Sequence, residues 1–123
     1  MSNTIRELQY EVAEVNEANG WRDTAERDDV NWQITQVALI ITEAAEAIEE
    51  LRNGKPAHET YYAVSENPSN WLRKPEGVPS ELADVVIRAL DCADLFGIDL
   101  QAIIREKIEY NRTRGYRHGG KVA

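Results

Sequence analysis

The sequence predicts an all-α fold, a bundle of four helices forming a single domain over residues 1–123. Apolar residues recur at intervals of three and four in four separate segments, which is the spacing of amphipathic helices. Capping residues and glycines bound these segments. A chain of 123 residues is also long enough for one hydrophobic core but too short for two.

The first two helices are predicted in the N-terminal half. Thr4 begins a capping box with Glu7, and Gly20 ends the first helix. Its apolar stripe comprises Ile5, Leu8, Val12 and Val15. The second helix is predicted from about Asn31 to Arg52, before Asn53 and Gly54. We expect its core stripe to comprise Ile34, Val37, Ile41, Ala45 and Ile48.

The last two helices are predicted in the C-terminal half. The third begins at Pro79 and Ser80 and ends at Gly97. Its inward residues are expected to be Leu82, Val85, Val86, Ala89, Ala93 and Phe96. Asp99 caps the fourth helix, which ends at Gly115 and is followed by a basic tail, residues 115–123. Its apolar face comprises Leu100, Ile103, Ile104 and Ile108.

Residues 55–79 form a long proline-rich loop between the second and third predicted helices. All four prolines lie there, and the segment has no helical period, although it has room for a short hairpin. A loop of this length in a small domain is either a lid or binding loop, or a variable crossover between two helices. The sequence leaves both interpretations open.

The composition favours a soluble, cytoplasmic protein. The net charge of −8 argues against nucleic acid as a partner, because phosphate-backbone binding requires a basic face. No apolar run reaches the roughly 18 residues that a membrane span needs, and no secretory signal is visible. The single cysteine, Cys92, excludes both an intramolecular disulfide and a cysteine-based zinc site.

Two carboxylate pairs stand at i, i+3 spacing on the second and third predicted helices. They are Glu43 with Glu46, and Glu81 with Asp84. Like charges at this spacing repel each other, so they are useful only with a cation between them. Four carboxylates from two adjacent helices would make an all-oxygen site suited to Mg²⁺ or Mn²⁺. The alternative is an acidic face exposed to solvent.

Basic residues gather at the C-terminal end. Residues 1–104 carry a net charge of −12, whereas residues 105–123 carry +4. Lys107, Asn111 and Arg114 share one face of the fourth helix, and His118 lies in the glycine-flanked tail that follows. A positive face beside a metal site is suited to a polyphosphate, although bases at a helix C-terminus also complement the helix dipole. Trp32, on the face of Glu43, is predicted to stack on a base or to pack in a core or interface.

The chain resembles the MazG-like, all-α nucleoside triphosphate pyrophosphohydrolases from about Gln9 to Lys121, outside much of residues 55–75. The resemblance rests on Glu43-Ala44-Ala45-Glu46 and on Glu81-Leu82-Ala83-Asp84-Val85-Val86-Ile87. It extends to Lys107, Asn111 and Arg114, and to the closing Tyr116-Arg117-His118-Gly119-Gly120-Lys121. One position departs from the pattern: the family often has an acid before the first glutamate, and this chain has Thr42. That leaves open which group activates water.

The resemblance implies Mg²⁺-dependent hydrolysis of a nucleoside triphosphate to the monophosphate and pyrophosphate, with Mn²⁺ as a substitute metal. The expected substrate is a deoxynucleotide or a non-standard nucleotide. Glu43, Glu46, Glu81 and Asp84 would be the catalytic metal ligands, and Lys107, Asn111 and Arg114 would contact phosphates or sugar. The resemblance also implies a homodimer or homotetramer. The alternative function is a helical module that senses nucleotides or binds a protein without hydrolysis.

Overall fold

The computed structural model describes residues 3–64, 73–117 and 122, and it confirms the all-α prediction. The helices are α1 (Ile5–Ala18), α2 (Val30–Arg52), α3 (Val78–Leu95) and α4 (Leu100–Thr113). Two of the predicted caps are present: the side chain of Thr4 accepts a hydrogen bond from the Glu7 amide, and that of Asp99 accepts one from the Ala102 amide. Among the described residues, no helix is both long and apolar enough to cross a membrane.

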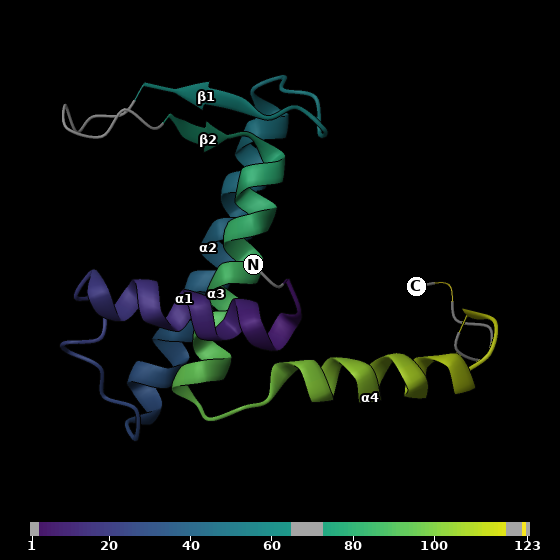
Figure 1. Ribbon diagram of the computed structural model, residues 1–123. Coiled ribbons are helices and arrows are strands. Elements are labelled where there is room, and N and C mark those ends of the chain that lie inside the picture. Colours follow the sequence, from purple (N-terminus) through teal and green to yellow (C-terminus); the bar gives the residue numbers. More distant parts are fainter. Residues whose placement is uncertain (1–2, 65–72, 118–121, 123) are drawn as a thin grey trace.

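A short β-hairpin lies in the segment between α2 and α3, at the far end of this helix pair (Figure 1). Strand β1 (Tyr61–Ala63) pairs antiparallel with β2 (Lys74–Glu76), and Tyr61 lies opposite Glu76. Gly77 then turns the chain into α3 with a φ of 104°. A side chain at Gly77 would collide with the carbonyl oxygen of Glu59, so only glycine suits this turn. The turn places Glu81 in the first turn of α3.

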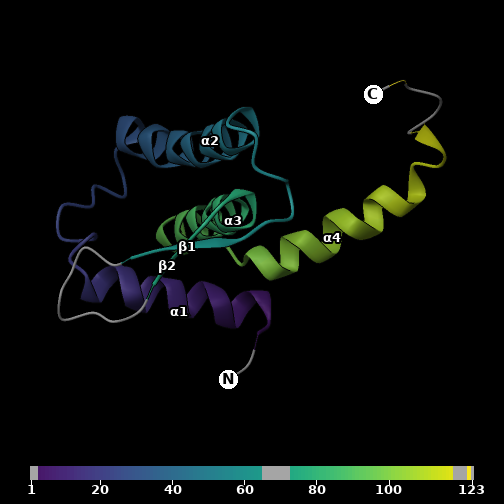
Figure 2. The same cartoon turned by 90° about the horizontal axis from the view of Figure 1, so that it is seen from above.

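The packed part of the fold has α3 at its centre, with α2 on one side and α1 on the other (Figure 2). Its buried apolar residues are small or medium in size: Ala13, Ala47, Val78, Leu90, Cys92, Ala93 and Leu95. Among the described residues, no large side chain is fully buried. The fold is therefore bundle-like, with a thin core.

The predicted core stripe of α2 is wrong. All five of its residues are exposed, including Ile34 (60%) and Ile41 (68%), whereas Glu43 and Ala47 are buried on the opposite side. The helix thus packs on α3 through the face that carries its carboxylates. Periodicity reveals that a helix has an apolar face, but it does not reveal which element covers that face.

The other predicted stripes are partly correct. In α3, Ala93 is buried and three predicted core residues are half-buried, but Leu82 and Val86 are exposed. In α4, Ile103 and Ile108 are exposed while Leu100 and Ile104 are half-buried. In α1, Val15 alone of the four predicted residues is exposed. The exposed residues of these stripes are therefore apolar side chains that no other described part of the chain covers.

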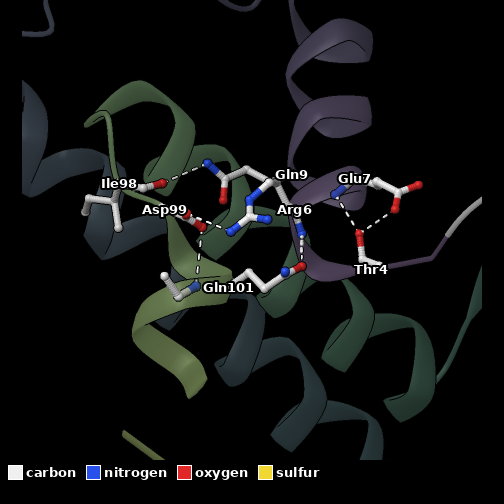
Figure 3. Close-up of polar contacts among 8 residues, drawn as sticks. Thr4, Arg6, Glu7, Gln9, Ile98, Asp99 and Gln101 are labelled. Atoms are coloured by element: carbon white, nitrogen blue, oxygen red, sulfur yellow. Dashed lines mark hydrogen bonds and ion pairs between the residues drawn. The ribbon is translucent and has the colours of Figure 1, made fainter. Parts of the chain in front are cut away.

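Helix α4 leads away from the other helices, and its contacts with them are mainly at its start (Figures 1 and 2). There, an Arg6 guanidinium nitrogen lies 2.8 Å from Asp99 Oδ2, and the Arg6 amide donates to Gln101 Oε1 (Figure 3). The Gln9 side-chain amide donates to the carbonyl of Ile98. All three hydrogen bonds are exposed, so each contributes modestly to stability. None of the residues of α4 is buried.

Candidate functional site

The packing of α2 against α3 brings the two predicted carboxylate pairs together. Carboxylate oxygens of Glu43, Glu46 and Glu81 all lie within 4.8 Å of one another. Asp84, one turn after Glu81 on α3, is close enough for the charges of Glu43 and Glu46 to act on it. We refer to these four residues as the carboxylate cluster. The two pairs, far apart in sequence, therefore form one group in space.

The carboxylate cluster has more negative charge than its surroundings neutralise. Burial raises the pKa of Glu81 to about 7, and its hydrogen bond with Glu46 and the negative charges of the cluster add to this rise. Burial also raises the pKa of Asp84, followed by the charge of Glu43. Both pKa shifts have the cause expected when carboxylates lie close together and partly away from water. A bound cation would lower both pKa values.

The donor set of the cluster fits Mg²⁺ or Mn²⁺. Glu81 Oε2 is buried and accepts no hydrogen bond, so it has a lone pair available for a ligand. Oxygens that bind one octahedral Mg²⁺ are about 3 Å apart when adjacent and about 4 Å apart when opposite. The three carboxylate oxygens, all within 4.8 Å of one another, would reach these separations by side-chain movements of about 1–2 Å. All the donors are carboxylate oxygens, which hard divalent cations prefer.

Arg88 is the basic partner that the structure places beside the cluster. Its Nε donates to Glu43 Oε1 at 3.1 Å, and the Glu43 side chain is only 10% exposed. Arg88 lies one turn after Asp84 on α3, and its positive charge favours the ionised form of Asp84. Glu43 is therefore held between the carboxylates of the cluster and a guanidinium.

A cavity of about 610 Å³ adjoins the cluster, which supplies two of its lining residues, Glu43 and Asp84. Trp32 and Arg88 line the same cavity. The other lining residues are Asn16, Trp21, Arg22, Thr24, Gln36, Leu39, Ile87, Asp91 and Leu95. The volume lies within the range of small-molecule sites, and the mixture of aromatic, amide and charged groups is typical of them. The structure thus places Trp32 on the same cavity as two of the carboxylates.

An ion-pair network stabilises one wall of this cavity. Arg22, in the segment between α1 and α2, donates to Asp91 at 2.6 Å and to Asp94 at 2.7 Å on α3. The Arg22 side chain is 10% exposed, so water screens these pairs weakly. The network holds the α1–α2 connection against α3 and thereby positions the side of the cavity that includes Trp21.

The predicted phosphate contacts on α4 do not meet the cluster within one chain. The C-terminal half of α4 extends away from α2 and α3 (Figures 1 and 2). Lys107 and Asn111 are exposed, and Arg114 is half-buried. The cations of Lys107 and Arg114 lie 5.6 Å and 5.8 Å from the centre of the Tyr110 ring, within cation–π range. His118 lies outside the described residues.

Sequence reasoning missed several residues of the site. Arg88 and Gln36 lie on the same helix faces as the carboxylates, and the spacing places them there, but the sequence alone assigned neither of them a role. Asn16 and Arg22 carry no such signal, because their neighbours at the cavity come from helices far along the chain. Only the tertiary contacts reveal them.

Comparisons with known proteins give one partial likeness. A segment of 38 residues is 50% identical to the dATP/dGTP diphosphohydrolase of Cyanophage S-2L. The match covers 31% of this chain and 36% of that protein, so it spans only about a third of each. No family model matches the chain, and no solved structure matches it.

Proposed function

We propose that this chain is a Mg²⁺-dependent nucleoside triphosphate pyrophosphohydrolase that converts a purine deoxynucleoside triphosphate to the monophosphate and pyrophosphate. The observation that carries the proposal is the carboxylate cluster of α2 and α3 beside a cavity large enough for a nucleoside. The partial likeness to a dATP/dGTP diphosphohydrolase supports the reaction class and the choice of purines. The residues that carry the resemblance to the MazG-like enzymes support the same reaction.

In this proposal, Glu43, Glu46, Glu81 and Asp84 hold Mg²⁺, or Mn²⁺ in its place. When bound, the metal supplies charge neutralisation at the phosphates and lowers the pKa of a coordinated water. The carboxylates would hold the metal at the place where the triphosphate binds, and one of them would accept the proton of the attacking water. Thr42 stands where the family often has an acid, and its side chain is exposed. Because threonine has no carboxylate, a member of the cluster would accept this proton.

The cavity is proposed to bind the base and sugar. The indole of Trp32 offers an apolar face for stacking. The side-chain amides of Asn16 and Gln36 each carry donors and an acceptor, which is the combination that pairs with the edge of an adenine or guanine. Arg88 remains beside Glu43, where its free guanidinium nitrogens are available to a phosphate oxygen.

The phosphate-binding role of Lys107, Asn111, Arg114 and His118 remains part of the proposal. To bind phosphates at the cluster, these residues must lie close to it. In the described part of a single chain, the C-terminal half of α4, which carries Lys107 and Asn111 and is followed by Arg114, extends away from the cluster. We therefore also propose that the working form is a homodimer or homotetramer.

A product assay tests the function. The protein is incubated with each common ribonucleoside and deoxyribonucleoside triphosphate plus Mg²⁺, and the products are separated by ion-exchange chromatography. We expect monophosphate and pyrophosphate in equal amounts, fastest with dATP or dGTP. Release of inorganic phosphate instead would contradict the proposed cleavage position. The absence of turnover with both Mg²⁺ and Mn²⁺ would overturn the proposal and, if nucleotides bind tightly, favour the sensing module.

Two variants attribute the activity to the cluster. Glu46→Ala removes an exposed ligand, so the fold should persist while turnover falls by at least about 100-fold. The matched control is Glu49→Ala, which removes an exposed carboxylate of the same helix whose partner is Arg52. We expect the control to retain its activity, because exposed ion pairs contribute little. Equal losses in the two variants would mean that the cluster is not the site.

A further inference from the structure

The cavity beside the carboxylate cluster is elongated along the α2–α3 pair. Its lining residues on α3 recur about every turn, and those on α2 do the same in the opposite direction: Asp84, Arg88, Asp91 and Leu95 on α3, and Glu43, Leu39, Gln36 and Trp32 on α2. Asp91 follows Asp84 by seven positions, which corresponds to about 10 Å along the helix. This length is comparable to the distance from the α-phosphate to the far edge of the base in an extended purine nucleotide. A nucleotide with its phosphates at the cluster therefore presents that edge near Asp91.

An ion pair lies at this far end of the cavity. Arg22 Nη2 lies 2.6 Å from Asp91 Oδ1, and both residues line the cavity. Their side chains are 10% and 19% exposed, so water screens the pair weakly. Arg22 comes from the α1–α2 connection, which lies at the end of the helix pair away from the β-hairpin (Figure 1). A base bound at this end would therefore lie against two partly buried charged groups.

Both members of this ion pair have hydrogen-bonding capacity left for a ligand. The contact with Arg22 uses Oδ1 of Asp91, and a carboxylate can accept several hydrogen bonds. Arg22 donates through its terminal nitrogens to Asp91 and to Asp94, whereas its Nε is buried and has no hydrogen-bond partner among the described residues. Buried donors without a partner are rare in folded proteins. An acceptor on a bound base would give this donor a partner.

Guanine has the hydrogen-bonding edge that matches this ion pair. Its N1–H and its exocyclic amino group are adjacent donors, which suit a carboxylate because a carboxylate only accepts. Its O6 is an acceptor beside them, which suits a guanidinium because a guanidinium only donates. Adenine instead has a lone pair at N1, which a carboxylate would repel. The side-chain amides of Asn16 and Gln36 suit either base, since an amide both donates and accepts, so the ion pair is the selective element.

From this arrangement we infer that Asp91 and Arg22 select guanine over adenine. The Asp91 carboxylate accepts hydrogen bonds from N1–H and the amino group, and the Arg22 guanidinium donates to O6. Guanine nucleotides are then the preferred purine substrates, and dGTP is preferred to dATP. The inference rests on the proposed function for its reaction, but the preference for guanine depends only on the cavity and can be measured as binding.

The first test measures the base preference of the wild-type protein. The substrates dGTP, dITP, dXTP and dATP differ only at the edge of the base, and kcat/KM is measured for each with Mg²⁺. Hypoxanthine, the base of dITP, lacks the amino group, so its kcat/KM should be about tenfold lower than that of dGTP. The kcat/KM of dATP should be lower by about 100-fold or more, because N1 and the group at C6 are both mismatched. A kcat/KM for dATP equal to or above that for dGTP overturns the inference and leaves the proposed function intact.

The second test exchanges the preferred base. In Asp91→Asn one oxygen becomes an amide nitrogen that donates, so the side chain matches xanthine, whose C2 carries an oxygen in place of the amino group. The preference for dGTP over dXTP should therefore fall by at least about 100-fold.

The matched control for this exchange is Asp94→Asn. Asp94 accepts from the same guanidinium at 2.7 Å, but it is not among the described residues that line the cavity. This variant should keep the wild-type order of substrates. The loss of a merely stabilising ion pair would affect the base preference of the two variants alike. That result, or an unchanged preference in both, overturns the inference.

Binding separates the failure of this inference from the failure of the proposed function. If the wild type turns over no nucleotide, the activity is wrong, and calorimetry with dGMP and dAMP in the presence of Mg²⁺ measures the preference directly. An affinity for dGMP at least about tenfold above that for dAMP supports the selection of guanine by the cavity. Equal affinities, or binding of neither monophosphate, overturn it. These measurements use the wild-type protein, so they do not depend on the folding of a variant.

Discussion

Arg88 Nε lies 3.1 Å from Glu43 Oε1, and this contact joins the centre of α3 to the most deeply buried carboxylate of the cluster. The two side chains differ in exposure: 43% of Arg88 is accessible, but only 10% of Glu43 is. The guanidinium can therefore move into solvent while the carboxylate cannot. Without a metal, Arg88 neutralises a charge that would otherwise be buried alone.

Arg88→Ala should destabilise the metal-free protein by about 1–2 kcal/mol, because Glu43 loses its hydrogen-bonded partner. Mg²⁺ should restore most of this loss by taking the place of the guanidinium. Urea unfolding with and without Mg²⁺ measures both effects. The matched control is Arg52→Ala, which breaks the exposed pair with Glu49 and should change stability by less than about 0.5 kcal/mol. Equal effects of the two substitutions would contradict this account of Arg88.

Mg²⁺ should raise the melting temperature of the wild-type protein, since a ligand that binds only the folded state stabilises it. Glu46→Ala should abolish most of the shift, and Glu49→Ala should preserve it. Thermal unfolding over a Mg²⁺ and a Mn²⁺ titration provides the measurement. A wild-type melting temperature that does not change at millimolar concentrations of either ion would contradict the proposed metal site.

The metal-free protein should lose stability as the pH rises from about 4.5 to about 7. The pKa of Glu81 is about 7 in the folded protein against an ordinary value of 4.5, so in this range the folded state binds a proton that the unfolded state does not. The stabilisation from this group is present at low pH and is lost as the pH passes the folded-state pKa. Urea unfolding in EDTA at several pH values measures the slope. Glu81→Gln should flatten it, and an unchanged slope in that variant would contradict the assignment.

Arg22→Ala should cost about 2–4 kcal/mol, because it leaves Asp91 and Asp94 without the cation that pairs with both. The effect should be larger than that of Arg6→Ala, whose pair with Asp99 is exposed on both sides. Urea unfolding of the two variants tests the ranking. A smaller loss of unfolding free energy for Arg22→Ala than for Arg6→Ala would contradict a stabilising role of this network.

Trp32→Ala should raise the KM for the preferred nucleotide by about tenfold or more and change kcat less, because stacking on a base is worth about 1–3 kcal/mol. Trp32→Phe keeps an aromatic face and should recover much of the affinity. Steady-state kinetics of the two variants provides the comparison. If both variants behave alike, the ring at this position does not contact the base.

Local signals predicted the helices well. Thr4 and Asp99 cap α1 and α4 as expected, since capping depends on hydrogen bonds within one turn. The two carboxylate pairs were also predictable, because i, i+3 spacing places both members of a pair on one helix face. That the two pairs meet required a further fact, the packing of α2 on α3 through its carboxylate-bearing side.

The sequence alone determined the four helices, the N-caps of α1 and α4, the carboxylate pairs and the basic character of the C-terminal end. Only the tertiary structure decided that Glu43 faces inward while Ile41 faces solvent, and that α4 leads away from the cluster. The same holds for the ion pairs of Arg88 with Glu43 and of Arg22 with Asp91. Hydrogen bonds and periodicity within a helix depend on near neighbours in the chain, so local sequence specifies them. Which helix face is buried depends on all the apolar surfaces that can pack against it, and these come from segments far apart in the sequence.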